Sequence, residues 1–221
     1  TGCASRPDSE QSMKKIVYHI VTNIVKLIFS ILCRIDKSQL HKVPKTSPLI
    51  IATNHINFLE APVIYSHLYP RKLTGVAKIE SWDKPLLKLL FTIWDIIPIN
   101  RGTVDNHAFD LMQEALKQNS ILAIAPEGTR SKDGKLLRGY PGIALLYARI
   151  QAPILPVVHY GGEKFWEKFK KVKRTDFHIV VGNPFMIDFN GEKLSRDVFK
   201  QVVDEVMYQL AALLPPEYRG Y

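Results

Sequence analysis

A histidine and a carboxylate five residues apart, His55 and Glu60, could together provide general base catalysis. If the carboxylate accepts a hydrogen bond from one imidazole nitrogen, the other nitrogen is free to take a proton from a hydroxyl or a thiol. On a regular helix two residues at this spacing lie about 140° apart and share no face. We therefore expect a loop or loose turn after His55. Taken alone, the pair is more typical of a helix cap followed by a solvated carboxylate.

Two polar segments of the chain each follow an apolar run. The histidine and carboxylate lie between residues 48–52, typical of a short buried strand, and residues 61–65, which fit a helix. Asn54 is a residue type preferred at helix N-caps, which would place His55 on the first helical turn. The second polar segment, residues 125–131, follows the strand-like run 120–124. Polar segments at the ends of two strands of one sheet can converge on one crevice.

These two segments resemble motifs of the glycerolipid acyltransferases typified by 1-acylglycerol-3-phosphate acyltransferase. The first family motif is Asn-His, four residues and then Asp; here Asn54 and His55 are followed by Glu60, where Asp is usual. The second motif, Pro-Glu-Gly-Thr-Arg, is present in full at residues 126–130. The combination is specific although neither motif alone is, and the resemblance extends from about residue 48 to residue 158.

The resemblance implies that His55, oriented by Glu60, is the catalytic base of an acyl transfer. The acyl donor would be acyl-CoA or an acyl-carrier protein, and the acceptor a lysophospholipid, with 1-acylglycerol-3-phosphate giving phosphatidic acid. These are substrates, so no cofactor is expected. The implied substrate-binding residues, some of them phosphate ligands, are Lys78, Arg101, Glu127, Gly128, Thr129 and Arg130.

Different roles for these residues stay open. Arg101 follows an apolar run and precedes Gly102, so that guanidinium and backbone could both approach a phosphate, but a surface turn also accounts for it. An ion pair between Glu127 and Arg130 is the structural alternative for that segment. A membrane-bound esterase or thioesterase could use His55 with water. A non-catalytic lipid-binding relative could have kept the scaffold and lost the usual Asp.

Composition limits the partners. The 221 residues are 46% hydrophobic and 23% charged, which suits one well-packed domain. A formal charge of +9 indicates an anionic partner: membrane lipid, a phosphate-bearing substrate or nucleic acid. We expect no nucleic acid, because zinc-finger spacing, RNP-type aromatic motifs and a basic helix-turn-helix pattern are missing.

The cysteines and the remaining histidines carry little functional signal. Cys3 and Cys33 give no disulfide framework and favour a reduced intracellular setting. The spacing of His, Cys, Asp and Glu predicts no metal site. Six histidines lack a setting comparable to that of His55, namely His19, His41, His67, His107, His159 and His178.

Residues 13–37 are predicted to form an amphipathic helix after a polar lead, residues 1–12, that resembles a tag or disordered segment. On a helical wheel, an arc of about 100° to 120° is polar or small. It contains Lys15, His19, Thr22, Asn23, Lys26, Ser30 and Arg34. The remaining positions are nearly all Ile, Val, Leu and Phe. A wide apolar face with a cationic strip is typical of an interfacial helix.

Three alternative roles for this helix are weaker. A full membrane span would place Lys26 near its middle at a cost of about 2.5–3.5 kcal/mol. A signal peptide would need a small-residue cleavage site, which the segment after the apolar run does not offer. Packing on the rest of the chain would account for the polar strip but leave a broad apolar face to cover. We therefore expect a monotopic contact with the cytoplasmic face of a membrane.

Residues 38–221 are predicted to form the acyltransferase domain, an α/β fold with a largely parallel sheet flanked by helices. Strands are expected at 48–52, 73–78, 96–99, 120–124, 153–158 and 177–182, and helices at 86–94, 109–118, 142–150 and 195–214. Prolines 153 and 156 favour an edge strand or a strand start for 153–158. A basic run with aromatic residues, 164–174, fits a solvated face, or contact with a membrane surface or an acidic carrier.

Overall fold

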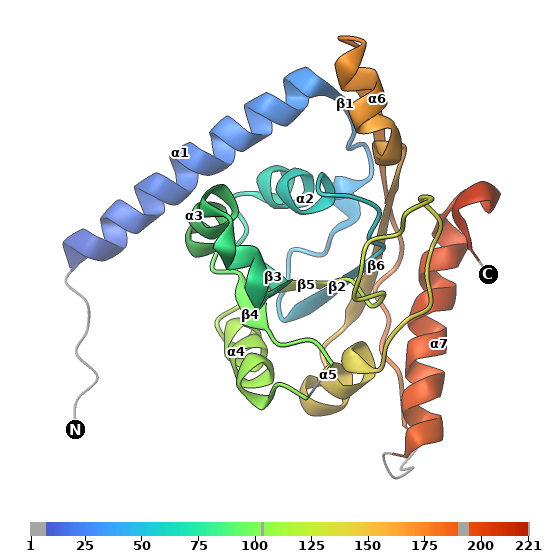
Figure 1. Ribbon diagram of the computed structural model, residues 1–221. Helices are drawn as coiled ribbons and strands as arrows, with labels where there is room; N and C mark the ends of the chain where they lie inside the picture. Colours follow the sequence, from blue (N-terminus) through green and yellow to red (C-terminus); the bar gives the residue numbers. More distant parts are fainter. Residues whose placement is uncertain (1–7, 103, 190–194, 221) are drawn as a thin grey trace.

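A computed structural model describes residues 8–102, 104–189 and 195–220 of the chain. Most of the predicted polar lead, residues 1–7, lies outside the described residues. The remainder is built around one sheet, and the strands and helices alternate along the chain as the sequence predicts (Figure 1).

A seven-stranded sheet of order β1-β7-β6-β2-β5-β3-β4 forms the centre of the fold (Figure 1). All of its described pairings are parallel except that of β6 with β7, which confirms a largely parallel sheet. Its strands are β1 (Cys33–Asp36), β2 (Leu49–Thr53), β3 (Leu73–Lys78), β4 (Ile97–Ile99), β5 (Ile121–Ile124), β6 (Ile154–Tyr160) and β7 (Thr175–Val181).

Helices cover both faces of this sheet. They are α1 (Asp8–Leu32), α2 (Glu60–Leu68), α3 (Pro85–Ile93), α4 (Asn106–Lys117), α5 (Gly142–Ile150), α6 (Phe165–Lys170) and α7 (Arg196–Leu213). Helices α4, α5 and α7 pack on one face with Ile50 and Ala52, and α1, α2 and α6 pack on the other with Leu49 and Ile51. Because both faces of β2 are covered, all five of its residues are buried and its sequence is continuously apolar up to Thr53.

The helix predicted at residues 13–37 ends earlier than expected. Helix α1 runs from Asp8 only to Leu32, and Cys33–Asp36 form β1, which pairs in parallel with β7. The guanidinium of Arg174 donates to the carbonyl oxygens of Ser30 and Cys33, both at 2.6 Å, and so satisfies carbonyls at the helix end. The sheet therefore begins before residue 38, the predicted domain boundary.

Of the two alternatives predicted for residues 153–158, the edge position is wrong, because β6 lies between β2 and β7. The strand start is confirmed for Pro153, which directly precedes β6. Ile50 N donates to the carbonyl of Pro153, so the odd-numbered residues of this segment turn their backbone groups toward β2. Pro156 faces the other side, where its carbonyl accepts from Gly182 N and the ladder with β7 starts only at Val157. Its missing N–H therefore breaks no pairing in the described sheet.

Helix α1 packs on the domain along a narrow stripe and leaves its apolar face outward. Thr22 and Val25 are buried, and the indole Nε1 of Trp94 donates to the Thr22 hydroxyl at 3.2 Å. Seven apolar side chains are between 40% and 62% exposed: Ile16, Val17, Ile20, Ile24, Leu27, Ile28 and Ile31. Residues Ser12–Leu32 are long and apolar enough to cross a membrane by length and composition alone.

Candidate active site

The loop that follows β2 is fixed to β6 by the side chain of Asn54. This amide is buried; it donates to the carbonyl of His159 at 2.9 Å and accepts from the His159 backbone N–H at 3.0 Å. It therefore continues the β2–β6 pairing beyond the last strand residue. Asn54 is not an N-cap as predicted, because α2 begins only at Glu60.

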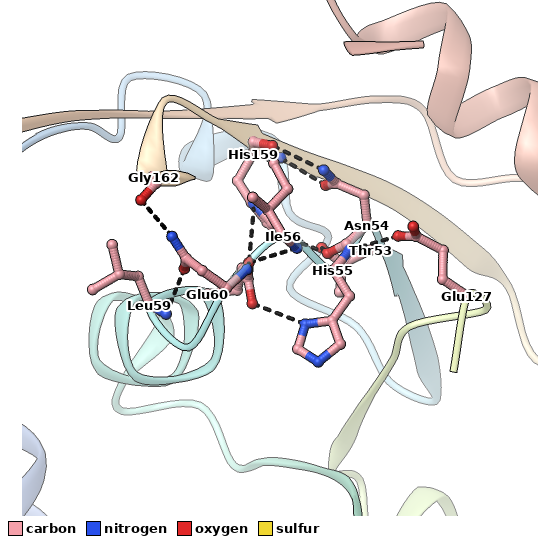
Figure 2. Close-up of polar contacts among 10 residues, drawn as sticks. Thr53, Asn54, His55, Ile56, Leu59, Glu60, Glu127, His159 and Gly162 are labelled. Atoms are coloured by element: carbon pink, nitrogen blue, oxygen red, sulfur yellow. Dashed lines mark hydrogen bonds and ion pairs between the residues drawn. The ribbon is translucent and has the colours of Figure 1, made fainter. Parts of the chain in front are cut away.

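His55 and Glu60 meet across this loop, which confirms that the residues between them are not helical. The Nδ1 atom of His55 lies 2.9 Å from Oε2 of Glu60 (Figure 2). The other carboxylate oxygen accepts from the backbone N–H of Ile56 at 2.8 Å and from that of Asn57. The loop thus folds around the carboxylate, and glutamate is long enough to reach the imidazole where the family usually has aspartate.

The electrostatics of Glu60 favour its ionised form. Burial, with only 3% of the residue exposed, would by itself raise the pKa of this carboxyl. The imidazoles of His159 and His55 and the N–H of Asn57 outweigh that effect, and the pKa of Glu60 falls below its usual value. A charged Glu60 can only accept, so we assign the hydrogen of this contact to Nδ1 of His55.

With Nδ1 engaged, the Nε2 atom of His55 carries the lone pair. Figure 2 shows this nitrogen pointing away from Glu60 and His159, and it has no hydrogen-bond partner among the described residues. The side chain is 26% exposed, whereas that of Glu60 is 5% exposed. The imidazole is therefore fixed by Glu60 at Nδ1 and has a free Nε2, which suits a group that takes a proton from an incoming molecule.

The second polar segment converges on His55, as predicted. Strand β5 pairs with β2, so the segments after these two strands emerge at the same edge of the sheet. The carboxylate of Glu127 accepts from the backbone N–H of His55 at 2.6 Å and from that of Leu137 at 2.7 Å. Ser131 N donates in turn to the carbonyl of His55 at 2.8 Å. Both backbone polar groups of His55 are thus bound by this segment.

Glu127 is fully buried, and it forms no ion pair with Arg130 in the part of the chain that the structure describes. Its structural role is therefore that of a backbone clamp, not the ion pair suggested by the sequence. Burial raises the pKa of Glu127 to about 7; the N–H groups of Leu137 and His55 lower it, and the charge of Glu60 raises it further.

The other predicted binding residues lie at the same edge of the sheet, and all of them except the half-buried Gly128 are exposed. Gly128 has a φ of +61°, which favours glycine, and its turn leads to exposed Thr129 and Arg130. Lys78 is the last residue of β3 and Arg101 follows β4, which pairs with β3 in parallel. None of these side chains contacts His55 or Glu60 through a hydrogen bond or ion pair between described residues.

Two residues that hold the loop were not predicted from the sequence. His159, set aside for lack of a comparable setting, is fully buried; its Nδ1 lies 3.8 Å from Oε1 of Glu60 and its Nε2 lies 2.6 Å from the carbonyl of Asn54. Burial lowers the pKa of His159, although Glu60 and the Asn54 carbonyl act in the opposite direction. Asn57 binds the Gly162 carbonyl and accepts from Leu59 N. For His159, the one signal in the sequence was its position directly after the apolar, strand-like run 153–158.

Comparisons with known proteins agree with this arrangement. A family model described as Acyltransferase matches residues 34–160, more than half of the chain. The chain is 33% identical over 154 residues to a 1-acyl-sn-glycerol-3-phosphate acyltransferase of Limnanthes douglasii, covering 68% of this chain and 53% of that protein. It is 25% identical over 169 residues to the protein of that name from Bacillus subtilis, covering 76% and 82%. The chain thus spans about half the length of the Limnanthes relative.

A solved structure has the same fold. It is the crystal structure of the 1-acyl-sn-glycerophosphate acyltransferase PlsC from Thermotoga maritima, with a TM-score of 0.66 and 22% sequence identity. The superposition covers 94% of this chain and 82% of the other. It confirms the mostly parallel sheet flanked by helices.

Proposed function

The chain belongs to the acyltransferase family, and on that premise we propose that it transfers a fatty acyl group from an acyl thioester to a lysophospholipid hydroxyl. The acceptor we propose is 1-acylglycerol-3-phosphate, since that is what the named relatives act on. The observation that carries the proposal is the His55 imidazole, held at Nδ1 by a buried carboxylate and open at Nε2.

In this proposal Nε2 of His55 takes the proton of the acceptor hydroxyl as its oxygen attacks the thioester carbonyl. A C–O bond forms and a tetrahedral intermediate results; the C–S bond then breaks, and the thiolate leaves with the proton returned by the imidazolium. Glu60 stays ionised, because its pKa is lowered, and stabilises the imidazolium between these two steps. No covalent acyl-enzyme is needed.

The exposed cations at the same edge of the sheet are proposed to hold the acceptor phosphate. Arg101 and Arg130 present guanidinium groups that suit a phosphate, and Lys78 adds a third positive charge. Gly128 and Thr129 would shape the acceptor site beside Arg130. For Glu127 we propose a positioning role in place of direct binding, because backbone N–H groups occupy both of its oxygens.

The apolar face of α1 supports membrane association, and we propose a monotopic enzyme on the cytoplasmic face. Its outward Ile, Leu and Val side chains would enter the bilayer surface while Lys15 and Lys26 meet anionic head groups. Arg34, which lies in β1 and pairs with Asp176 at 3.6 Å, would add a third positive charge beyond the end of the helix. Such a location suits an enzyme whose acceptor is a membrane amphiphile. The acyl donor we propose is acyl-CoA or an acyl-carrier protein.

A product assay tests the proposal against its rivals. Purified protein would be incubated with lysophosphatidic acid and a radiolabelled acyl thioester, in parallel as acyl-CoA and as acyl-carrier protein. We expect phosphatidic acid with at least one donor and none with His55→Ala. Free fatty acid as the only product would indicate a hydrolase. An absence of turnover together with lipid binding would indicate a non-catalytic lipid-binding protein.

A further inference from the structure

The segment from α6 to β7 exposes an unusual group of apolar side chains. Trp166 is 58% exposed, Phe169 is 48% exposed and Val172 is 96% exposed. Trp166 and Phe169 lie three residues apart on α6, with ring centroids 6.0 Å apart, and Val172 follows in the turn after the helix. We call these three residues the aromatic tip.

Val172 is a poor choice for this turn on local grounds. Its φ of +52° lies in the left-handed region, where β-branched residues are genuine outliers. Glycine or asparagine would fit this backbone better, and either would also remove an apolar side chain from water. The valine therefore strains the turn and exposes an isopropyl group without contributing to the core, and a residue of this kind points to a function outside the fold.

The aromatic tip is surrounded by positive charge. Residues 164–174 contain six basic residues and one acidic residue, Glu167. Lys168 pairs with Asp176 and Lys171 with Glu167. Lys164, Lys170 and Lys173 are exposed and lie outside the ion pairs of the described residues. Apolar side chains ringed by exposed lysines match the chemistry of an anionic lipid surface.

The position of the aromatic tip links it to both α1 and the active-site loop. Arg174 binds the carbonyls of Ser30 and Cys33, so the turn after α6 lies at the carboxyl end of α1, as Figure 1 shows. On the other side, the Phe58 ring lies 5.4 Å from that of Trp166 and belongs to the loop between His55 and Glu60. The tip therefore lies between the carboxyl end of α1 and the loop that carries the imidazole.

We propose that the aromatic tip is a second membrane contact, inserting Trp166, Phe169 and Val172 into the head-group region of an anionic bilayer while its lysines bind lipid phosphates. It extends the contact proposed for α1, and its location next to Phe58 brings the active-site loop to the lipid surface. An acidic carrier protein is the competing partner. The bilayer is favoured because a carrier that needs only positive charge does not account for a strained, nearly fully exposed valine.

Vesicle binding by the 221-residue chain tests this without any need for turnover. Sedimentation would be measured with phosphatidylglycerol and with phosphatidylcholine vesicles for Val172→Gly and Trp166→Ala. Tyr208→Ala, an exposed aromatic of α7, is the matched control. We expect Val172→Gly to weaken phosphatidylglycerol binding by about five- to tenfold with an unchanged or higher melting temperature, since burying such a side chain contributes about one power of ten.

Charge variants sharpen the experiment. Lys170→Gln combined with Lys173→Gln should weaken binding to phosphatidylglycerol by roughly tenfold or more at low salt and change phosphatidylcholine binding little. Lys117→Gln, an exposed lysine at the end of α4 on the other face of the sheet, should change neither. Trp166→Phe should restore most of the binding that Trp166→Ala loses.

Three other results of these measurements would contradict the proposed membrane contacts. If Leu27→Ser on α1 weakens vesicle binding but Val172→Gly and the lysine pair do not, the tip is no membrane contact. If the tip variants keep vesicle binding but lose activity with acyl-carrier protein alone, the surface binds a carrier. If the unaltered chain binds no vesicles, both membrane contacts are wrong while acyl transfer stands on its own assay.

Discussion

The loop between β2 and α2 and the helix α1 differ in whether their side chains find partners within the chain. In the loop, the polar groups of Asn54, His55 and Glu60 are buried or half-buried, yet almost every one has a partner in the chain. Along α1, in contrast, seven Ile, Val and Leu side chains are 40% to 62% exposed and face outward, although Val25 on the opposite side packs on the domain. The polar groups of the loop are satisfied by other parts of the chain, whereas α1 presents a face that only another phase or molecule can cover.

This difference determines how each region should respond to substitution. The open position in the loop is a single nitrogen, Nε2 of His55, and its chemistry follows from the contacts behind it. The open face of α1 consists of many equivalent side chains, and its role follows from their number. Substitutions in the loop should therefore act on rate with one group dominating, and substitutions on α1 should act on binding in small increments.

The largest effect is expected from His55→Ala. Loss of a general base typically costs a rate factor on the order of 10²–10⁴, and no neighbouring group among the described residues offers a replacement. Because the side chain is partly exposed and its backbone contacts remain, circular dichroism should be unchanged. Initial rates of phosphatidic acid formation would measure the loss, with His107→Ala on α4 as control. Near-normal turnover would remove His55 as the base.

Glu60→Gln should have the next largest effect, a loss on the order of 10²-fold in kcat. The amide can turn its NH₂ toward Nδ1, which favours the tautomer with the proton on Nε2, and it cannot stabilise the imidazolium. Glu60→Asp should retain activity within about tenfold, because a carboxylate persists there and the family accepts this residue. If the glutamine variant matched the unaltered protein at saturating substrate, the histidine–carboxylate pair would be wrong even if His55 mattered.

The sequence predicted the parts of the site that depend on local spacing. The separation of His55 and Glu60 required a loop, and two apolar runs placed the loop and the Pro-Glu-Gly-Thr-Arg segment at strand ends. The buried partner His159 was missed because its approach to Asn54 spans 105 residues and depends on β6 lying next to β2. No local pattern specifies that strand order.

The lack of local information on strand order also accounts for the predictions about the fold that were wrong. The helix predicted to reach residue 37 stops at Leu32 because Arg174, 144 residues after Ser30, binds its last carbonyls and because β7 accepts Cys33–Asp36 as a neighbour. The prolines of residues 153–158 suggested an edge or a strand start. Pro153 does precede the strand, but β6 is no edge, because Pro156 turns its missing N–H away from β2. Strand and helix positions were local and could be predicted, whereas pairing and termination were set from a distance.

The contact between Glu127 and the backbone of His55 should make the stability of the protein depend on pH. Its carboxyl has a pKa of about 7 in the folded protein and 4.5 as the ordinary value, so between these pH values the folded state binds more protons than the unfolded state. Stability contributed by this group should therefore fall as pH rises from about 4.5 to about 7, by up to roughly 3 kcal/mol.

Urea unfolding at several pH values would measure this effect as the difference between the unaltered chain and Glu127→Gln. The glutamine variant cannot titrate, so the difference in unfolding free energy should change across this window and level off above it. A difference that stays constant from about pH 4.5 to about pH 8 would mean that Glu127 is ionised throughout. In that case the clamp on the backbone of His55 and Leu137 would be a charged one.

The smallest effect is expected on α1, where a matched pair of substitutions separates packing from membrane contact. Leu27 is exposed, whereas Val25, two residues earlier, is buried against the domain. Leu27→Ser should leave the free energy of unfolding within about 0.5 kcal/mol of that of the unaltered chain. It should weaken binding to anionic vesicles by about tenfold, because one inserted leucine contributes about 1.5 kcal/mol. Val25→Ala should do the reverse, lowering stability by about 1 kcal/mol and leaving vesicle binding of the folded protein unchanged. Vesicle sedimentation and urea unfolding on both variants would measure these two effects.

If Leu27→Ser destabilised the protein as much as Val25→Ala, the outward face of α1 would be part of the fold. The contrast with the loop, whose polar groups have partners within the chain, would then disappear.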